Sequence, residues 1–82
     1  MNRMTGKAAA RPRRQLVVCI SNDGYEASLE RRKIYVSLPD AKAEKHGLIR
    51  VIDESGEDYL YSKKRFRPVR LPEEVRSAVL AA

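Results

Sequence analysis

Apolar residues occur along this chain in short runs, as they do in the strands of small β-sheets. The run Leu16–Ile20 holds five apolar residues and ends at a Ser-Asn-Asp-Gly turn signal, so it predicts a strand covered on both sides. Residues 33–38 alternate, with isoleucine, valine and leucine on one side and tyrosine and serine on the other. This second run predicts a half-buried strand whose aliphatic side faces the core.

Three further strands are predicted downstream. The third covers residues 48–53, and the Asp-Glu-Ser-Gly sequence that closes it is a hairpin signal whose glycine supplies a positive φ. The fourth strand covers residues 57–62. The fifth covers residues 66–71, and its proline places it at an edge or a bulge.

Two short helices complete the expected elements. Asp40 can cap a helical turn over residues 41–45, which the glycine at position 47 would end. Residues 72–82 begin with Pro-Glu-Glu, a favourable helix start, and form the second helix. We expect this C-terminal helix to pack on the barrel through the stripe of Leu71, Val75 and Val79.

These elements define the fold class. Five short strands with no room for a crossover helix predict a mainly all-β protein, a small five-stranded antiparallel barrel over residues 15–71. At 82 residues the chain forms one domain with a thin core.

The closing segment of the chain resembles Src-homology-3 domains. Residues 59–69 align without gaps with the strand, 3₁₀ turn and last strand of that family, and the order of elements over residues 15–70 is similar. The resemblance implies a Src-homology-3-like barrel. In that family an aromatic shelf binds proline-rich ligands, but its positions fall here on Leu48, Ser62 and Arg65, and the chain has no tryptophan. No polyproline ligand is therefore expected.

A second resemblance covers nearly the whole chain after residue 14. Residues 24–29 (Gly-Tyr-Glu-Ala-Ser-Leu), 38–40 (Leu-Pro-Asp) and 49–61 resemble segments of short uncharacterised bacterial proteins. This resemblance implies a stand-alone bacterial domain, and it brings no assigned activity with it.

The positive charge of the chain is concentrated at its start. Seventeen Lys and Arg against eleven Asp and Glu give a net charge of +6. Residues 1–14 hold five of the cations and no acid, which predicts a flexible basic arm and leaves twelve cations against eleven acids, or +1, for residues 15–82. A single cysteine, no membrane-length apolar run and no signal-peptide pattern together indicate a cytoplasmic protein without a membrane segment.

The residues that usually carry chemistry do not form a catalytic or metal site. Cys19 lies within an apolar strand, which predicts a buried, unreactive thiol, and His46 is expected at an exposed helix end without a catalytic partner. The carboxylates of the hairpin, Asp53, Glu54, Glu57 and Asp58, lack the spacing of a calcium loop and are expected to keep the hairpin soluble. We therefore expect no enzyme activity, no cofactor and no metal.

With catalytic and metal sites set aside, binding through the protein surface remains as the expected function. The first hypothesis is a protein-interaction or adaptor domain. Its expected contact surface has Tyr25 and Tyr59 as anchors and Arg50 and Arg65 at the rim, because aromatic residues and arginine dominate protein interfaces. The protein partner is unknown. An exposed edge strand allows a monomer or a weak dimer.

The alternative is a nucleic-acid-binding barrel, because small barrels combine basic grooves with stacked aromatic residues. The basic arm would add reach, whereas the near-neutral barrel and the acidic hairpin disfavour this function. Its expected contacts are two basic clusters, Arg31, Arg32 and Lys33 before the second strand and Lys63, Lys64, Arg65 and Arg67 before the fifth.

Overall fold

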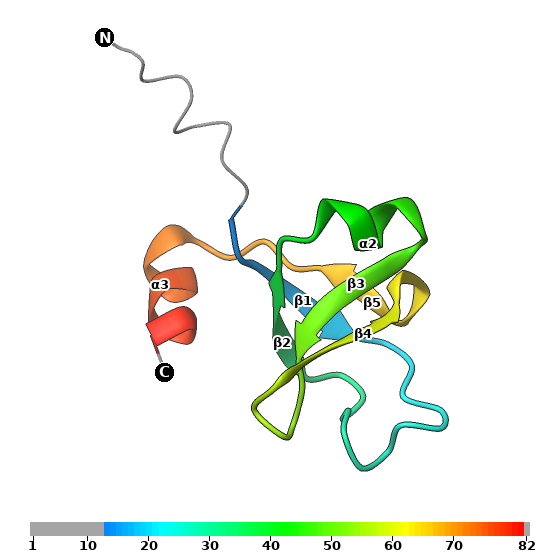
Figure 1. The fold of residues 1–82 in the computed structure, drawn as a ribbon. Coiled ribbons are helices and arrows are strands. Elements are labelled where there is room, and N and C mark those ends of the chain that lie inside the picture. Colours follow the sequence, from blue (N-terminus) through cyan, green and yellow to red (C-terminus); the bar gives the residue numbers. More distant parts are fainter. Residues whose placement is uncertain (1–12, 82) are drawn as a thin grey trace, which may run out of the picture.

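The computed structural model describes residues 13–81, so the basic arm predicted over residues 1–14 lies, apart from its last two residues, outside the described part of the chain. Five strands form one antiparallel sheet in the order β4-β3-β2-β1-β5, which curls into a half-barrel (Figure 1). The predicted class, mainly β with a short C-terminal helix, is confirmed. The strands are β1 (Gln15–Cys19), β2 (Ile34–Leu38), β3 (Leu48–Ile52), β4 (Asp58–Ser62) and β5 (Phe66–Pro68). The helices are α2 (Ala41–Lys45), the 3₁₀ turn η1 (Lys63–Arg65) and α3 (Glu73–Ala81).

The turn and cap signals of the sequence act as expected. The carboxylate of Asp40 accepts a hydrogen bond of 2.9 Å from the Ala43 N–H and so caps α2. The hairpin between β3 and β4 closes through a bond of 3.0 Å from the Gly56 N–H to the Asp53 carbonyl, and the glycine has a φ of +85°. Both turns therefore follow from local residue chemistry.

The two sides of β2 are reversed relative to the prediction. Tyr35 and Ser37 are the buried residues, whereas Ile34, on the aliphatic side, is exposed. The physical reason is the amphipathic character of tyrosine: the Tyr35 ring packs edge-on against Phe66 at 6.4 Å while its hydroxyl reaches polar partners.

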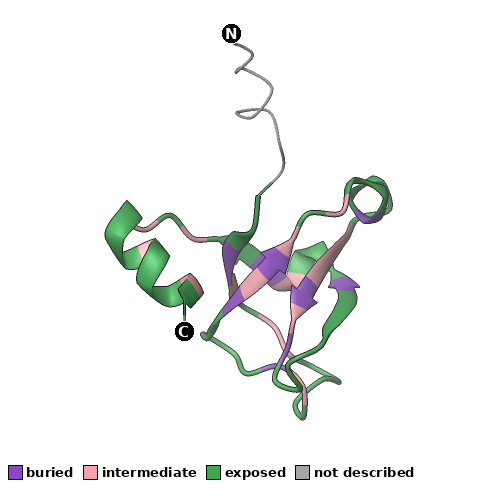
Figure 2. Ribbon diagram, turned by 60° about the vertical axis from the view of Figure 1, so that its left-hand side comes forward, coloured by how far each residue is buried: buried purple, intermediate pink, exposed green. Residues whose placement is uncertain are grey.

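The core lies inside the curl of the sheet, where the buried positions of the strands face one another (Figure 2). Cys19 and Val51 are fully buried, which confirms the predicted burial of the cysteine. Leu29 is only 1% exposed although it comes from the long loop between β1 and β2, residues 20–33. This loop is therefore part of the core.

Two tyrosine hydroxyls fasten the long loop and the hairpin to the barrel. Tyr61 donates a hydrogen bond of 2.6 Å to the Asp53 carboxylate, and Tyr35 donates one of 2.5 Å to the Glu54 carboxylate. The Tyr35 hydroxyl also accepts a bond of 2.7 Å from the Glu30 N–H, in the long loop. Burial and these carboxylates raise the pKa of both tyrosines, so the hydroxyls remain protonated donors.

The hairpin carboxylates differ in role, which corrects the expectation that all four serve solubility. Asp53 is buried, and burial by itself would raise its pKa, but bonds from Ser55 (2.9 Å from its N–H, 2.6 Å from its hydroxyl) and from Tyr61 outweigh burial and lower it. Glu54 has a lowered pKa because Lys33 and Tyr35 bond to it. Glu57 and Asp58 remain exposed.

The C-terminal helix α3 forms at the predicted residues but presents a different side to the barrel. Val75, 43% exposed, and Val79 are uncovered, and the partly buried helical positions are Arg76 and Leu80. The Arg76 guanidinium donates a bond of 2.6 Å to the Arg14 carbonyl beside β1, which turns the helix about 100° from the predicted stripe. The two valines that we expect to pack on the barrel are thus open to solvent.

We predict that Leu29→Ala lowers the free energy of unfolding by about 2–5 kcal/mol, as for a core residue, because it leaves a cavity beneath the loop. Urea unfolding followed by circular dichroism measures this change. The exposed Val79→Ala is the control and changes stability by less than about 0.5 kcal/mol. A loss for Leu29→Ala no larger than that of the control would contradict the role of the loop in the core.

We also predict that the folded protein loses stability as the pH falls, because Asp53 becomes protonated. Its folded pKa lies below the unfolded value near 3.8, so the stabilisation is complete above about pH 5 and is lost as the pH falls through the folded pKa. Asp53→Asn removes this dependence and costs about 1–3 kcal/mol at neutral pH. Urea unfolding between about pH 3 and 7 measures both effects, and Glu57→Gln, an exposed hairpin carboxylate, serves as the control. Equal pH dependence in the wild type and Asp53→Asn would refute the assignment.

Candidate functional site

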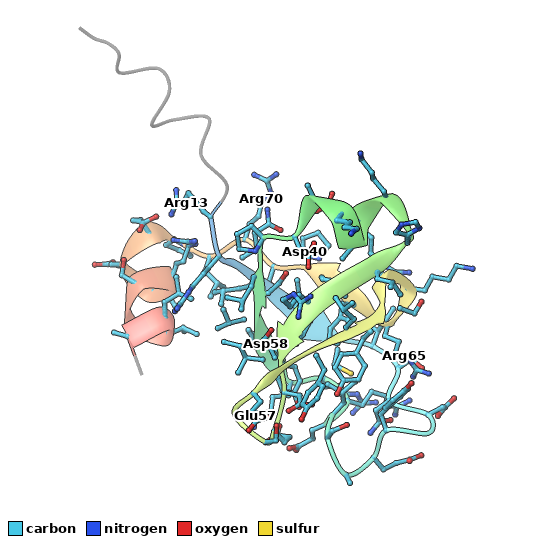
Figure 3. The ribbon with its side chains drawn as sticks, viewed as in Figure 1. Arg13, Asp40, Glu57, Asp58, Arg65 and Arg70 are labelled. Carbon is cyan, nitrogen blue, oxygen red and sulfur yellow. The ribbon has the colours of Figure 1, made fainter. Side chains whose placement is uncertain are left out.

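An arginine and a tyrosine from distant segments stack at the loop end of the barrel. The guanidinium of Arg65, in η1, lies 4.6 Å from the ring centroid of Tyr25, in the long loop (Figure 3). The edge of the Tyr25 ring meets Tyr61 at 5.1 Å, and Arg65 also donates to the Ser21 carbonyl at 3.3 Å. We call this pair the Tyr25–Arg65 stack. It joins two of the four residues predicted for protein binding on a partly exposed surface.

Arg50, also predicted for the rim, does not join the stack. Its guanidinium lies between the carboxylates of Asp40 and Asp58, at 2.9 Å from each, across β3 (Figure 3). The N–H of Ala43 and the Arg50 guanidinium lower the pKa of Asp40, so this acid remains charged. Arg50 therefore acts as an ion-pair bridge between the cap of α2 and the edge strand β4.

Tyr59, the other predicted anchor, is on the edge strand. Its hydroxyl donates a bond of 3.1 Å to Glu57, which raises the pKa of the phenol, and the side chain is 48% exposed. It makes no contact with the Tyr25–Arg65 stack among the aromatic pairs of residues 13–81.

The two predicted basic clusters flank the same end of β1. The Arg32 N–H donates to the Cys19 carbonyl at 2.7 Å, and the Ile20 N–H donates to the Arg65 carbonyl at 2.8 Å. The clusters are thus separated by one strand, with backbones about 10 Å apart. The topology brings them together as the nucleic-acid hypothesis requires.

Several cations of these clusters are already engaged. Lys33 pairs with Glu54 at 2.7 Å, which raises the pKa of the ammonium group, and Arg65 covers Tyr25. The guanidinium of Arg67 donates a hydrogen bond of 2.8 Å to the Phe66 carbonyl. The cluster residues that are exposed and whose side chains form neither an ion pair nor a hydrogen bond within residues 13–81 are Arg31, Arg32, Lys63 and Lys64.

A recess of about 210 Å³ opens on the other side of η1, between β5, α2 and the start of β3. Its volume exceeds the ~150 Å³ of an engineered cavity that binds benzene, so it can hold one branched or aromatic side chain. Apolar residues form most of its wall, namely Val17, Leu38, Leu48, Ile49, Phe66 and Pro68. An apolar recess with a few polar groups is the usual form of a ligand site.

The wall of the recess contains a buried hydroxyl. Ser37 is 7% exposed, and no side-chain hydrogen bond within residues 13–81 uses its hydroxyl. A buried hydroxyl without a partner costs about 1–3 kcal/mol, so a ligand that supplies a partner recovers this cost. Ser37 is therefore a polar anchor for whatever fills the recess.

Charged side chains surround the recess. Lys63 and Arg67 contribute cations on the η1 side, and Glu44 contributes an acid on α2, whereas Asp40 is neutralised by Arg50. The turn η1 thus separates two features, with Lys63 at the recess and Arg65 in the stack. We refer to the recess and the Tyr25–Arg65 stack together as the η1 surface.

Sequence reasoning missed the recess because its wall comes from six separate elements. The one sequence signal was Ser37, a serine between two aliphatic residues, but strict alternation assigned it to the solvent side of β2. Neither a group of three or more potential metal ligands nor a helix able to cross a membrane occurs in the described part of the chain.

Comparisons with known proteins add no family. No protein-family model matches the chain, and neither a curated protein nor a solved structure is significantly similar to it.

Proposed function

We propose that this protein is a non-enzymatic interaction module that binds an extended segment of a partner protein on its η1 surface. The observation that carries the proposal is the apolar recess, in whose wall the Ser37 hydroxyl has no hydrogen-bond partner within residues 13–81. In the proposal, one apolar side chain of the partner fills the recess and a backbone or side-chain polar group bonds to Ser37.

The charges beside the recess define the chemistry of the partner segment. Lys63 and Arg67 favour acidic residues next to the apolar anchor, because the nearby Asp40 is already paired with Arg50. The Tyr25–Arg65 stack lies beyond η1 and offers a flat contact of the kind that contributes strongly to interfaces. We therefore propose a segment with an apolar residue flanked by Asp or Glu.

The resemblance to Src-homology-3 domains supports this site. The residue at the position of that family's shelf tryptophan, Leu48, lines the recess. A smaller aliphatic residue there supports a concave site for a side chain in place of a flat shelf for a polyproline helix. The resemblance to short bacterial proteins supports a bacterial setting for the proposed interaction, and we propose that this setting is the cytoplasm.

We predict that random peptides displayed on phage and selected on the full chain converge on an apolar residue flanked by acids. Ser37→Ala removes the polar anchor and weakens binding of a selected peptide about 5- to 10-fold, and Lys63→Gln weakens it similarly. Fluorescence anisotropy of the labelled peptide measures both. Because Ser37 has no partner in the described fold, Ser37→Ala is at least as stable as the wild type.

Ser77→Ala on α3 and Lys45→Gln on α2 are the matched controls, since both residues are exposed and do not line the recess. Both control variants bind the selected peptide as the wild type does. Failure of the selection to enrich any sequence would refute the proposal, and so would an enriched peptide that binds all four variants equally.

Nucleic-acid binding is the second candidate, and the observation that favours it is the position of both basic clusters at the same end of β1. The four exposed cations there could contact phosphates together with the basic residues 1–14. The acidic hairpin and the engagement of Lys33 and Arg65 weigh against this candidate.

If this second candidate holds, binding of generic DNA to the full chain weakens steeply with salt. Each phosphate contact contributes about −0.9 to the slope of log K against log salt, so Lys63→Gln/Lys64→Gln makes the slope less negative by about 2. Residues 1–14 contribute equally to both proteins, so the difference reports the barrel alone. Anisotropy titrations at several salt concentrations measure the slopes, and equal slopes would exclude these two lysines.

A further inference from the structure

The two edges of the sheet differ in their capacity to pair with another strand. At one edge, β5 has only three residues and ends in Pro68, which lacks an N–H donor. At the other edge, β4 has five residues, contains no proline and keeps an unbroken register with β3 (Figure 1). Natural sheets usually protect such an edge, so the open edge at β4 needs a partner or an explanation.

The hydrogen bonds of the β3–β4 hairpin identify the groups on the open edge. The Asp53 N–H donates to the Glu57 carbonyl at 3.1 Å, and the Lys63 N–H donates to the Gly47 carbonyl at 2.9 Å. Because hydrogen-bonded pairs alternate along an antiparallel ladder, the odd-numbered residues of β4 direct their backbone groups toward β3. The backbone groups of Asp58, Leu60 and Ser62 therefore face away from the sheet.

We propose that β4 pairs with β4 of a second copy of this chain, antiparallel and with the two-fold axis at Leu60. In this register Leu60 lies opposite Leu60 of the second copy, and Asp58 lies opposite Ser62. Asp58, Leu60 and Ser62, whose backbone groups face outward, lie opposite one another, so each of these pairs exchanges two hydrogen bonds, whereas the odd-numbered pairs between them exchange none. No other antiparallel register overlaps β4 along its whole length.

In the same register, the side chains of β4 in one copy are complementary to those of β4 in the second copy. Glu57 lies opposite Lys63 of the second copy, so the acid at one end of β4 meets the base at the other end, twice per dimer. Tyr59 lies opposite Tyr61, an aromatic pair of the kind that stabilises adjacent strands. The pairing also covers Leu60 and Tyr59, which are 43% and 48% exposed in the single chain.

The pairing does not depend on the proposed function. Ser37 lies on β2, two strands from this edge. Tyr25 contacts Tyr61 of β4 and Lys63 lines the recess, so Leu60→Lys, which lies outside the η1 surface, is the variant that tests the pairing alone. Two joined copies would present two η1 surfaces, one on each side of the axis.

Sedimentation velocity of the full chain between about 1 µM and 1 mM tests the pairing, since an interface of this small size has micromolar or weaker affinity. We expect a concentration-dependent dimer. Glu57→Lys or Lys63→Glu alone places like charges opposite each other and weakens the dimer about 10-fold or more. The double variant Glu57→Lys/Lys63→Glu restores the pairing, and an equimolar mixture of the two single variants forms a heterodimer.

Leu60→Lys gives an independent test, because it places two ammonium groups opposite each other at the axis and leaves the dimer undetectable. Val79→Lys, on α3, is the matched control and dimerises as the wild type does. A wild type that stays monomeric over the whole range, or a double variant that does not recover, would overturn the proposal.

Discussion

The fold depends on two tyrosine hydroxyls that connect the inside of the barrel to its outermost turns. A half-barrel of five short strands leaves its interior open, and the long loop covers it with Leu29. That loop has no regular ladder of its own, so it is held by Tyr35 at the Glu30 N–H and by the hairpin carboxylates that both tyrosines bind. Tyr35 and Tyr61 therefore bury their rings in the core and keep their hydroxyls hydrogen-bonded to the surrounding turns.

This arrangement explains where the candidate site lies. Because Tyr61 is fixed by Asp53, its ring supports Tyr25, and Tyr25 in turn supports the guanidinium of Arg65. On the other side of η1, the curl of the sheet and the short β5 leave the recess that Ser37 lines. The 3₁₀ turn η1, between the stack and the recess, gives the surface its shape.

The sequence predicted most of the elements because they depend on local chemistry. The cap at Asp40, the glycine turn at Gly56 and the apolar run of β1 each act within a few residues, and each was found as expected. The prediction of which side of β2 faces the core was wrong, because alternation alone ranks isoleucine above tyrosine for burial. The Tyr35 hydroxyl finds its partners in the loop before β2, at Glu30, and in the distant hairpin, at Glu54.

The candidate site was only partly predictable for the same reason. Tyr25 and Arg65 were identified by residue type, but their stacking depends on packing between segments forty residues apart. The ion pairs of Arg50 could not be predicted, because its two carboxylate partners come from separate elements that only the fold brings together. No pattern of hydrophobic and polar residues along the sequence indicates the recess, because residues from separate elements line it.

The contrast between the two ends of the sheet has one more consequence. Pro68 and the shortness of β5 prevent that side from accepting a strand, so the sheet can extend in one direction only. A two-fold contact through β4 uses up the remaining open side in both molecules. With the proposed pairing, assembly would stop at two chains and close on itself, which would protect a small, β-rich protein from growing into a fibre.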